Sequence, residues 1–471
     1  MASGSNEYEI LIRSVETVVP TVLVQKHRLP LSNFDLLLPP AHARHYFCFQ
    51  KPTPTTVSTK DASAGFITFP TMKVAALKAA LSKVLVIYYP LAGEIVTNSA
   101  GEPEILCNNR GVDLIEAYAD VELRKLNLYN PDDSVEAKLL PKDTKDTLCI
   151  QVTELRCGAM VVGCAFDHRV ADAYSFFMFM SAWANIALNK PINQMPSFCR
   201  FLLSSRNISS SNSSDPIYDQ IFTPLSLQPP PNPEISSETR VNHIYYISAV
   251  DIARLQELSS HSHSKIVCFI AYFWKILART ARRGEKLCSM GAVVDGRSFM
   301  KTVHGDNFMK NYFGNVLSVP FGNLQAKTLI HMTLAEVAEE VSKWLSPAKK
   351  EDHFLGLLDW VEAQRPKPIV STAHLGDSNE EDESISCVVS SGTRFPEINF
   401  GWGNATFSSC HFPVREKGGY LFPILQSNTG DWVVYAQVAP RIVAAMEQEP
   451  TIFCPLRTLH EYKSKSSRAR L

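Results

Sequence analysis

The chain has 471 residues, of which 45% are hydrophobic and 20% charged, and its formal net charge is −1. This length is enough for two full domains, since single hydrophobic cores rarely grow past about 250–300 residues. With so little net charge, no field of the whole chain would hold nucleic acid or an anionic membrane surface, although a local basic site for an anionic cofactor is not excluded.

The N-terminal sequence MASGSNEYEILIRSVETVV has early acidic residues and no apolar run of signal-peptide length. No stretch reaches the roughly 18–20 apolar residues of a membrane span. The 11 cysteines are scattered and include no CxxC pair, which predicts reduced thiols and no zinc site. These features predict a cytoplasmic protein that binds neither membranes nor nucleic acid.

Helix and strand patterns mix along both halves of the chain, which predicts an α/β or α+β protein. Apolar residues at helical spacing predict a helix over 72–88, ended by Pro90. The following elements are expected in order: a hairpin of strands 148–153 and 159–166, helices over 172–187 and 265–281, a strand over 291–294, a helix opened by the capping box Thr333-Leu-Ala-Glu336, and a strand over 432–438.

Residues 204–240 form the clearest shift in composition. They include the run SSRNISSSNSSD and six prolines, a composition that cannot bury enough apolar surface to fold alone. We therefore expect an N-terminal domain over 1–203, a crossover linker over 204–240 and a C-terminal domain over 241–471.

The segment around His168 carries the most informative chemistry. The apolar run 161–166 predicts a strand that ends just before His168, and Asp172 follows at the expected N-cap of the next helix. The carboxylate can then hold the bend while the imidazole faces a cleft. Histidine is the side chain whose ordinary pKa suits proton transfer near neutrality. This HxxxD pattern alone names no reaction.

Two motifs together point to a family. His168-Arg-Val-Ala-Asp172 resembles the HxxxD motif of the plant BAHD acyltransferases, and Asn399-Phe-Gly-Trp-Gly403 resembles their DFGWG motif. Four further stretches agree with the family: Leu31-Ser-Asn-Phe-Asp35, Tyr89-Pro-Leu-Ala-Gly93, Val294-Asp-Gly-Arg297 and Tyr312-Phe-Gly-Asn315. The resemblance covers essentially the whole chain, and it is strongest to the coniferyl alcohol acyltransferase branch.

The resemblance implies two similar chloramphenicol-acetyltransferase-like domains with an active-site channel between them. His168 would be the general base that deprotonates a hydroxyl or amine as it attacks the thioester of acyl-CoA, and CoA thiolate would leave. Asp172 would point away from the channel and order the loop. Acyl-CoA would be a co-substrate, with no permanently bound cofactor and no metal, and the protein would be a monomer.

The resemblance also assigns residues to CoA. Ser264 and Lys265 open the expected helix at 265–281, where a helix N-terminus and a lysine suit a phosphate. A plain N-cap with an exposed lysine is the alternative interpretation. Ser390 and Ser391 match positions that line the family's CoA channel.

Three departures from the family occur near the second motif. Asn399 replaces its aspartate, which in the family pairs with the arginine matched by Arg297. Gly401, Trp402 and Gly403 are kept as structural support, but the loop before Asn399 is shorter by two residues. Gly392 stands where many relatives carry a tryptophan beside the acceptor.

The sequence therefore predicts an O-acyltransferase that acts on a small phenylpropanoid or other aromatic alcohol. N-acylation of an amine is an alternative, as is a family member that has lost catalysis and acts as a scaffold. The C-terminal Ala469-Arg470-Leu471 resembles the Ser-Lys-Leu peroxisomal signal, which makes the peroxisome the alternative to the cytoplasm.

Overall fold

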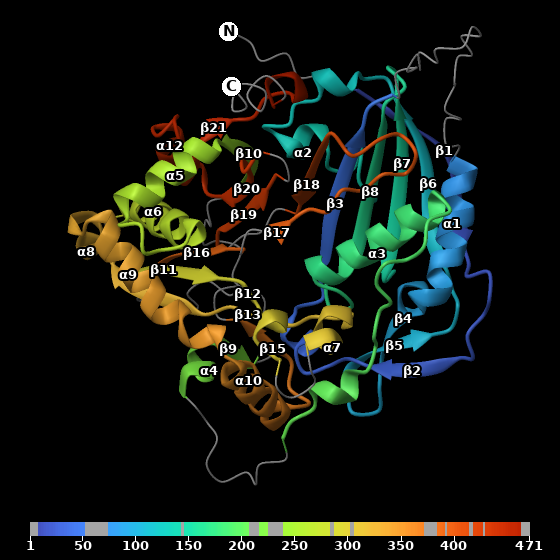
Figure 1. Ribbon diagram of the computed structural model, residues 1–471, viewed down its shortest axis with the longest axis horizontal. Helices are drawn as coiled ribbons and strands as arrows, with labels where there is room; N and C mark the ends of the chain where they lie inside the picture. Colours follow the sequence, from blue (N-terminus) through green and yellow to red (C-terminus); the bar gives the residue numbers. More distant parts are fainter. Residues whose placement is uncertain are drawn as a thin grey trace, which may run out of the picture.

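Two mixed sheets with helices packed on them form the protein (Figure 1). The computed structural model describes residues 8–51, 74–142, 146–206, 216–224, 239–282, 287–301, 306–371, 384–390, 393–413, 418–426 and 429–462. The mixed α/β class with two domains, predicted from the sequence, is confirmed. No helix in these ranges combines the length and apolar character needed to cross a bilayer.

The first sheet has six strands among the described residues. Their order is β1 (Ile10–Val18), β6 (Val112–Ala119), β7 (Leu148–Leu155), β8 (Met160–Asp167), β3 (His42–Phe49) and β18 (Phe407–His411). Helices α1 (Val74–Ile87) and α3 (Ala173–Ala187) lie across it (Figure 1). Helix α1 confirms the first predicted helix. Its Leu81 and Val84, three residues apart, are fully buried in the core shared with the sheet.

The hairpin of β7 and β8 confirms the prediction from residues 148–166. The two strands pair antiparallel, and six of the eight residues of β7 in a row are buried, as expected of a strand covered on both faces. Gly158 closes the turn with a φ of +77°, a conformation that costs glycine little, and its N–H donates to the carbonyl of Leu155 at 2.7 Å. The hairpin delivers His168 to the end of β8.

The second sheet is built from strands of the C-terminal half. Its order is β14 (Phe321–Gln325), β11 (Leu287–Ala292), β16 (Ser384–Val389), β19 (Tyr420–Leu425), β20 (Trp432–Val438), β10 (Val241–Ile247) and β21 (Cys454–Pro455), with β17 (Thr393–Arg394) pairing β19. Every residue of β20 is buried, and its bounds equal the predicted 432–438. Helix α6 (Lys265–Arg279) places ten of its residues in this core, among them Trp274.

Two strands pair with strands from the other half of the chain. Strand β18 comes from the C-terminal half but pairs antiparallel with β3, at the edge of the first sheet. Within the expected linker, helix α4 (Pro216–Ile221) and strand β9 (Phe222–Pro224) are formed, and β9 pairs with β15 (Ile369–Ser371). Tyr218, Ile221 and Phe222 are buried in the second core. Composition therefore missed an apolar segment inside residues 204–240, of which 207–215 and 225–238 lie outside the described residues.

The remaining elements surround the two sheets. The helices are α2 (Pro131–Ser134), α5 (Ala249–Leu258), α7 (Asp306–Asn311), α8 (Ala326–His331), α9 (Leu334–Leu345), α10 (Glu351–Gln364) and α12 (Pro440–Glu447). The strands are β2 (His27–Pro30), β4 (Glu94–Thr97), β5 (Pro103–Cys107), β12 (Val294–Asp295) and β13 (Leu317–Ser318), and short 3-10 helices cover Asp35–Leu37, Tyr89–Ala92, Leu123–Lys125, Arg200–Leu203, Gly296–Ser298 and Pro347–Lys349. The predicted capping box at Thr333 and Glu336 is present at the start of α9.

Candidate active site

A cavity of about 210 Å³ is lined by residues of both halves of the chain. Ala43 on β3 and Phe166 on β8 contribute to its wall from the first sheet, and Val388 on β16 and Ile424 on β19 contribute from the second. Most of the wall is apolar. The side chains that can hydrogen bond are those of His45, His168, Asp172, Tyr174, Asp295, Ser371, Ser390, Tyr420 and Gln437. A mainly apolar cavity with a few polar groups is the usual form of a small-molecule site.

His168 is held in this cavity by backbone contacts from both halves. Its N–H donates to the carbonyl of Ala41 at 2.9 Å, and its carbonyl accepts from the side-chain amide of Asn315 at 2.9 Å. The side chain is half-buried, and its Nδ1 is buried without a hydrogen-bond partner among the described residues. The backbone of His168 is thus held by residues of both halves, Ala41 and Asn315.

Burial lowers the pKa of His168 below its ordinary value of 6.5. The carboxylates of Asp172 and Asp167 oppose this effect because they favour the protonated ring, but desolvation outweighs them. The imidazole is therefore neutral near pH 7. In that form it can accept a proton from a group in the cavity.

Asp172 is the N-cap of α3, as the sequence predicts. Its carboxylate accepts from the N–H of Ser175 at 3.0 Å. It also accepts two hydrogen bonds from the guanidinium of Arg297, at 2.6 and 3.1 Å. The side chains of Asp172 and Arg297 are only 2% and 5% exposed, so this is a buried, two-pronged ion pair. It links the loop that carries His168 to the C-terminal half of the chain.

The predicted pairing of Arg297 with Asn399 is wrong. Asn399 instead accepts a hydrogen bond from the N–H of Gly401 at 2.7 Å and bridges Asn404, inside its own loop. Arg297 is bound by Asp172 and Asp295. A buried guanidinium is stabilised more by two carboxylates than by a neutral amide, which is the physical reason for the observed choice.

The rest of the second motif packs on the first core. Trp402 is 5% exposed, and its ring lies 5.4 Å from that of Phe49 on β3. Gly401 and Gly403 have φ values of +94° and +87°, which side-chain-bearing residues rarely adopt. None of these three residues lines the cavity. They therefore lie outside the cavity wall, and Trp402 belongs to the first core.

Asp295 lies in the cavity and was missed by the sequence analysis, although it precedes Arg297 by two residues. Its Oδ1 lies 3.1 Å from the Arg297 guanidinium. Burial raises the pKa of Asp295, the charge of Asp172 raises it further, and Arg297 opposes both. For Arg297, burial acts against the charged form, but the two carboxylates outweigh it and raise the pKa. One cation thus holds two carboxylates at the edge of the cavity.

His45 is a second histidine in the cavity wall that the sequence analysis missed. It is 5% exposed and its Nδ1 has no partner among the described residues. Burial, with a smaller contribution from the charge of His168, lowers the pKa of His45 to about 3. The signal in the sequence is the alternation of Ala43, His45 and Phe47, which places them on one face of β3. This neutral ring lies among aromatic side chains: Phe166, Phe176, Phe177 and Phe395.

The residues expected to bind CoA do not all lie together. Ser390 lines the cavity, and its N–H donates to the carbonyl of Leu421 at 2.8 Å. Ser391, and Gly392 beside it, lie outside the described residues. Ser264 and Lys265 are exposed at the start of α6, where the Ser264 side chain makes no capping hydrogen bond, and neither lines the cavity.

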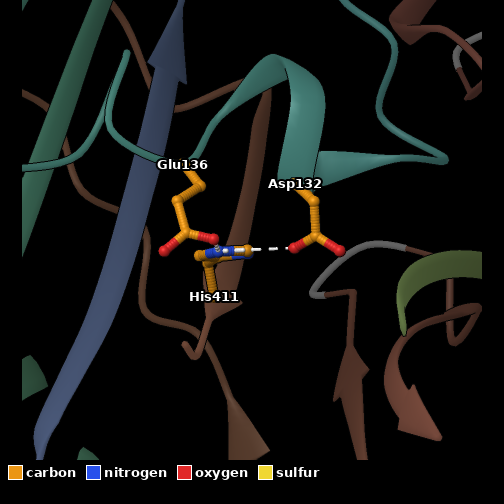
Figure 2. Close-up of side chains that lie close together, drawn as sticks. All are labelled: Asp132, Glu136 and His411. Atoms are coloured by element: carbon orange, nitrogen blue, oxygen red, sulfur yellow. Dashed lines mark hydrogen bonds and ion pairs between the residues drawn. The ribbon is translucent and has the colours of Figure 1, made fainter. Parts of the chain in front are cut away.

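One group of potential metal ligands is found among the described residues, and it lies outside the cavity wall. Figure 2 shows His411, at the end of β18, between the carboxylates of Asp132 and Glu136. The Nε2 atom of His411 is 3.1 Å from Glu136 and 3.8 Å from Asp132. Arg44 and Asn242 bind the two carboxylates as well. The ligand atoms therefore already have protein partners, and the group joins α2 to β18 and β10.

Comparisons with known proteins agree on one family. The family model described as "Transferase family" matches residues 8–452. A hydroxycinnamoyl-CoA:5-hydroxyanthranilate N-hydroxycinnamoyltransferase of Avena sativa is 26% identical over 422 residues, which are 85% of this chain and 90% of that protein. A shikimate O-hydroxycinnamoyltransferase of Nicotiana tabacum is 25% identical over 454 residues, 88% of this chain and 93% of that one. The crystal structure of vinorine synthase is similar with a TM-score of 0.67 at 20% identity, covering 95% of this chain and 99% of that one.

Proposed function

The chain belongs to the Transferase family, that of the plant BAHD acyltransferases, and on this premise we propose that it moves an acyl group from acyl-CoA to the hydroxyl of a small aromatic acceptor. The observation that carries the proposal is a neutral, half-buried histidine in a cavity lined by both halves of the chain. A group in that position can remove the acceptor's proton.

In this mechanism His168 is the general base. It takes the proton of the acceptor hydroxyl as the oxygen attacks the thioester carbonyl. The tetrahedral intermediate then collapses and expels CoA thiolate, which the proton neutralises. Asp172 acts as a positioning residue because its carboxylate is fully engaged by Ser175 and Arg297, and it is not a second base. The thioester supplies the activation, so the residues need only bind, orient and move one proton.

The donor would enter where the family resemblance places CoA. Ser390 and Ser391 are assigned to its channel, and Ser390 lines the cavity. Ser264 and Lys265 are assigned to its phosphates, since they open a helix of 15 residues whose N-terminal N–H groups and dipole favour an anion.

The test is thiol release by the purified chain from a panel of acyl-CoAs and aromatic alcohols. Release should require both substrates. The His168→Ala variant should lower kcat by about 10²–10⁴-fold with an unchanged circular dichroism spectrum. His331→Ala, at an exposed histidine of α8, is the matched control and should retain full activity. Normal turnover by a folded His168→Ala protein, or release without an acceptor, would contradict the proposal.

N-acylation is the second candidate, because the Avena sativa relative is named as an N-acyltransferase. Adding anthranilate-type amines to the same acceptor panel separates the two reactions. The absence of thiol release with every acceptor would favour the scaffold alternative. A monomer in the cytoplasm stays our expectation, with the peroxisome as the alternative. The signal-like Ala469-Arg470-Leu471 lies outside the described residues.

A further inference from the structure

Asn315 holds the backbone of His168 and is itself oriented by Asp35. Its side-chain nitrogen donates to the carbonyl of His168 and to Oδ1 of Asp35, both at 2.9 Å. The backbone N–H of Asn315 donates to the same carboxylate oxygen at 2.8 Å. Asp35 and Asn315 are both fully buried. The motif stretches 31–35 and 312–315 therefore meet beside the proposed base.

The orientation of the Asn315 amide follows from these partners. The carboxylate of Asp35 also accepts from the N–H and the hydroxyl of Ser32, so it acts as an acceptor throughout. Since a backbone carbonyl and this carboxylate both accept, the nitrogen of the Asn315 amide must face them. The Oδ1 atom is left over as an acceptor. It is buried without a partner among the described residues, and a buried acceptor that lacks a donor is destabilising.

His168 can supply the matching donor. Its Nδ1, the ring nitrogen nearer the backbone that Asn315 binds, is also buried without a partner in the part of the chain that the structure describes. A neutral imidazole carries one proton, and the hydrogen bond made by one ring nitrogen decides which of the two holds it. A proton on Nδ1 can satisfy both buried atoms after a small rotation of the ring. It leaves Nε2 unprotonated.

The pKa of His168 agrees with this arrangement. Burial lowers the pKa, and the hydrogen bond of the Asn315 side chain is among the weaker effects that raise it. A hydrogen bond to an uncharged side chain raises the pKa of a histidine when the ring is the donor, which requires Oδ1 as the acceptor. Other titratable groups surround the ring, its contacts or the cavity, and the variants below leave all of them in place: His45, Asp167, Arg169, Asp172, Tyr174, Asp295, Arg297, Cys410 and Tyr420, with Asp35 and Arg200 behind Asn315.

We propose that Asn315 is a positioning residue for the base: its Oδ1 accepts the Nδ1–H of His168, which fixes the ring and its tautomer and leaves Nε2 to take the acceptor's proton. Asp35 acts through Asn315, because it holds the amide in the orientation that leaves Oδ1 for the ring. This inference rests on the proposed function and adds a residue to it.

Nuclear magnetic resonance of the chain labelled with ¹⁵N in its histidine rings shows the tautomer directly, without substrate. The His168 signals are those lost in His168→Ala. At a pH well above 6.5 the wild-type ring should carry its proton mainly on Nδ1. Asn315→Leu replaces the amide by an apolar group of similar size. In this variant the share of the Nδ1–H tautomer should fall, and the titration midpoint of His168 should move to lower pH because an effect that raises the pKa is lost.

The same variant separates positioning from binding. Its kcat should fall about 10- to 100-fold with KM little changed, since a misplaced base slows proton transfer without weakening substrate binding. Asn315→Ala, which removes the amide without adding an apolar group, is the second variant if Asn315→Leu does not fold.

Asn33→Leu is the matched control. Asn33 is 3% exposed, and its side-chain amide donates to the carbonyl of Leu358 at 2.9 Å, a bond of the same kind between the two halves but outside the cavity wall. This variant should lose stability and keep the wild-type tautomer and midpoint.

Two results would overturn the inference: a wild-type proton on Nε2, or the same tautomer share in the wild type and in a folded variant at position 315. Absence of thiol release by a wild-type protein whose His168 carries its proton on Nδ1 would overturn the proposed function instead. The two failures are therefore distinguishable.

Discussion

His168 is anchored through its backbone to both halves of the chain, and burial lowers its pKa. If the neutral ring is the base, kcat/KM should rise with pH on the acid side and level off above a midpoint below 6.5. Because the charge of Asp172 raises the pKa of His168, Asp172→Asn should move that midpoint to still lower pH.

The measurement is a pH profile of kcat/KM at subsaturating donor. His331→Ala should reproduce the wild-type midpoint. A midpoint above 6.5, or one that rises in the Asp172→Asn protein, would mean that another group controls the reaction.

For Arg297 the partner expected from the sequence, Asn399, differs from the observed partners, Asp172 and Asp295, and this difference can be tested. Asp172→Asn should destabilise the protein by about 3–5 kcal/mol, because it leaves a buried guanidinium with one carboxylate in place of two. A double-mutant cycle of Asp172→Asn with Arg297→Met, read by urea unfolding, should give a coupling energy of about 0.5–3 kcal/mol.

The matched cycle combines Asn399→Ala with Arg297→Met. It should give a coupling energy near zero, since the bonds of Asn399 to described residues stay within its own loop. Coupling of similar size in both cycles would contradict the observed pairing.

These residues show what local sequence can predict. The N-cap of Asp172 and the capping box of Thr333 and Glu336 depend on neighbours within three residues, and both are present. The partner of Arg297 lies 125 positions away. Several carboxylates and amides compete for one guanidinium, and only the folded arrangement decides among them. His45 escaped notice for a related reason. The alternation along β3 places Ala43, His45 and Phe47 on one face, but only the fold decides that this face meets the cavity.

At the scale of elements, the chain predicts which segments become strands better than where they pair. Strand β20 is apolar along its whole length, and its bounds were predicted correctly. Strand β18, at 407–411, has no local feature that assigns it to the first sheet. Its register with β3 is set by the packing of both halves, which sequence periodicity does not contain.

The junction shown in Figure 2 holds β18 to α2 and carries a pH prediction. The hydrogen bond from His411 lowers the pKa of Glu136, although burial opposes it. Since the folded-state pKa lies below the ordinary 4.5, this carboxylate stabilises the protein fully above that pH and progressively less as the pH falls through the lower value. Glu136→Gln should therefore lower the Tm at pH 6 and flatten its decline below pH 4.5.

Thermal unfolding followed by circular dichroism between pH 3.5 and 6 tests this. The control is Glu257→Gln, at an exposed position of α5. The prediction is contradicted if the slope of Tm against pH is the same in Glu136→Gln as in the control. In that case the junction does not contribute to the pH dependence of stability.

For the whole molecule, the division into domains over 1–203 and 241–471 with a linker over 204–240 remains our proposal. The pairings of β18 with β3 and of β9 with β15 bear on where the chain can be cut. A cut between residues 225 and 238 interrupts no described strand or helix and gives two fragments, 1–224 and 239–471. The pairings of β18 with β3 and of β9 with β15 then join one fragment to the other. The cut leaves β18 on the fragment that lacks the rest of its sheet.

Fragment 1–224 alone should be insoluble, because without β18 it exposes an unpaired edge of β3 beside buried apolar residues such as Phe47. Coexpressed with fragment 239–471, it should copurify as a complex, since the two halves share the cavity and the ion pair of Asp172 with Arg297. Ser409→Pro, in the centre of β18, should reduce copurification several-fold because proline removes a strand N–H. Ser409→Ala keeps that N–H and is the matched control. A soluble fragment 1–224 that unfolds cooperatively on its own would show that the first sheet does not need its sixth strand.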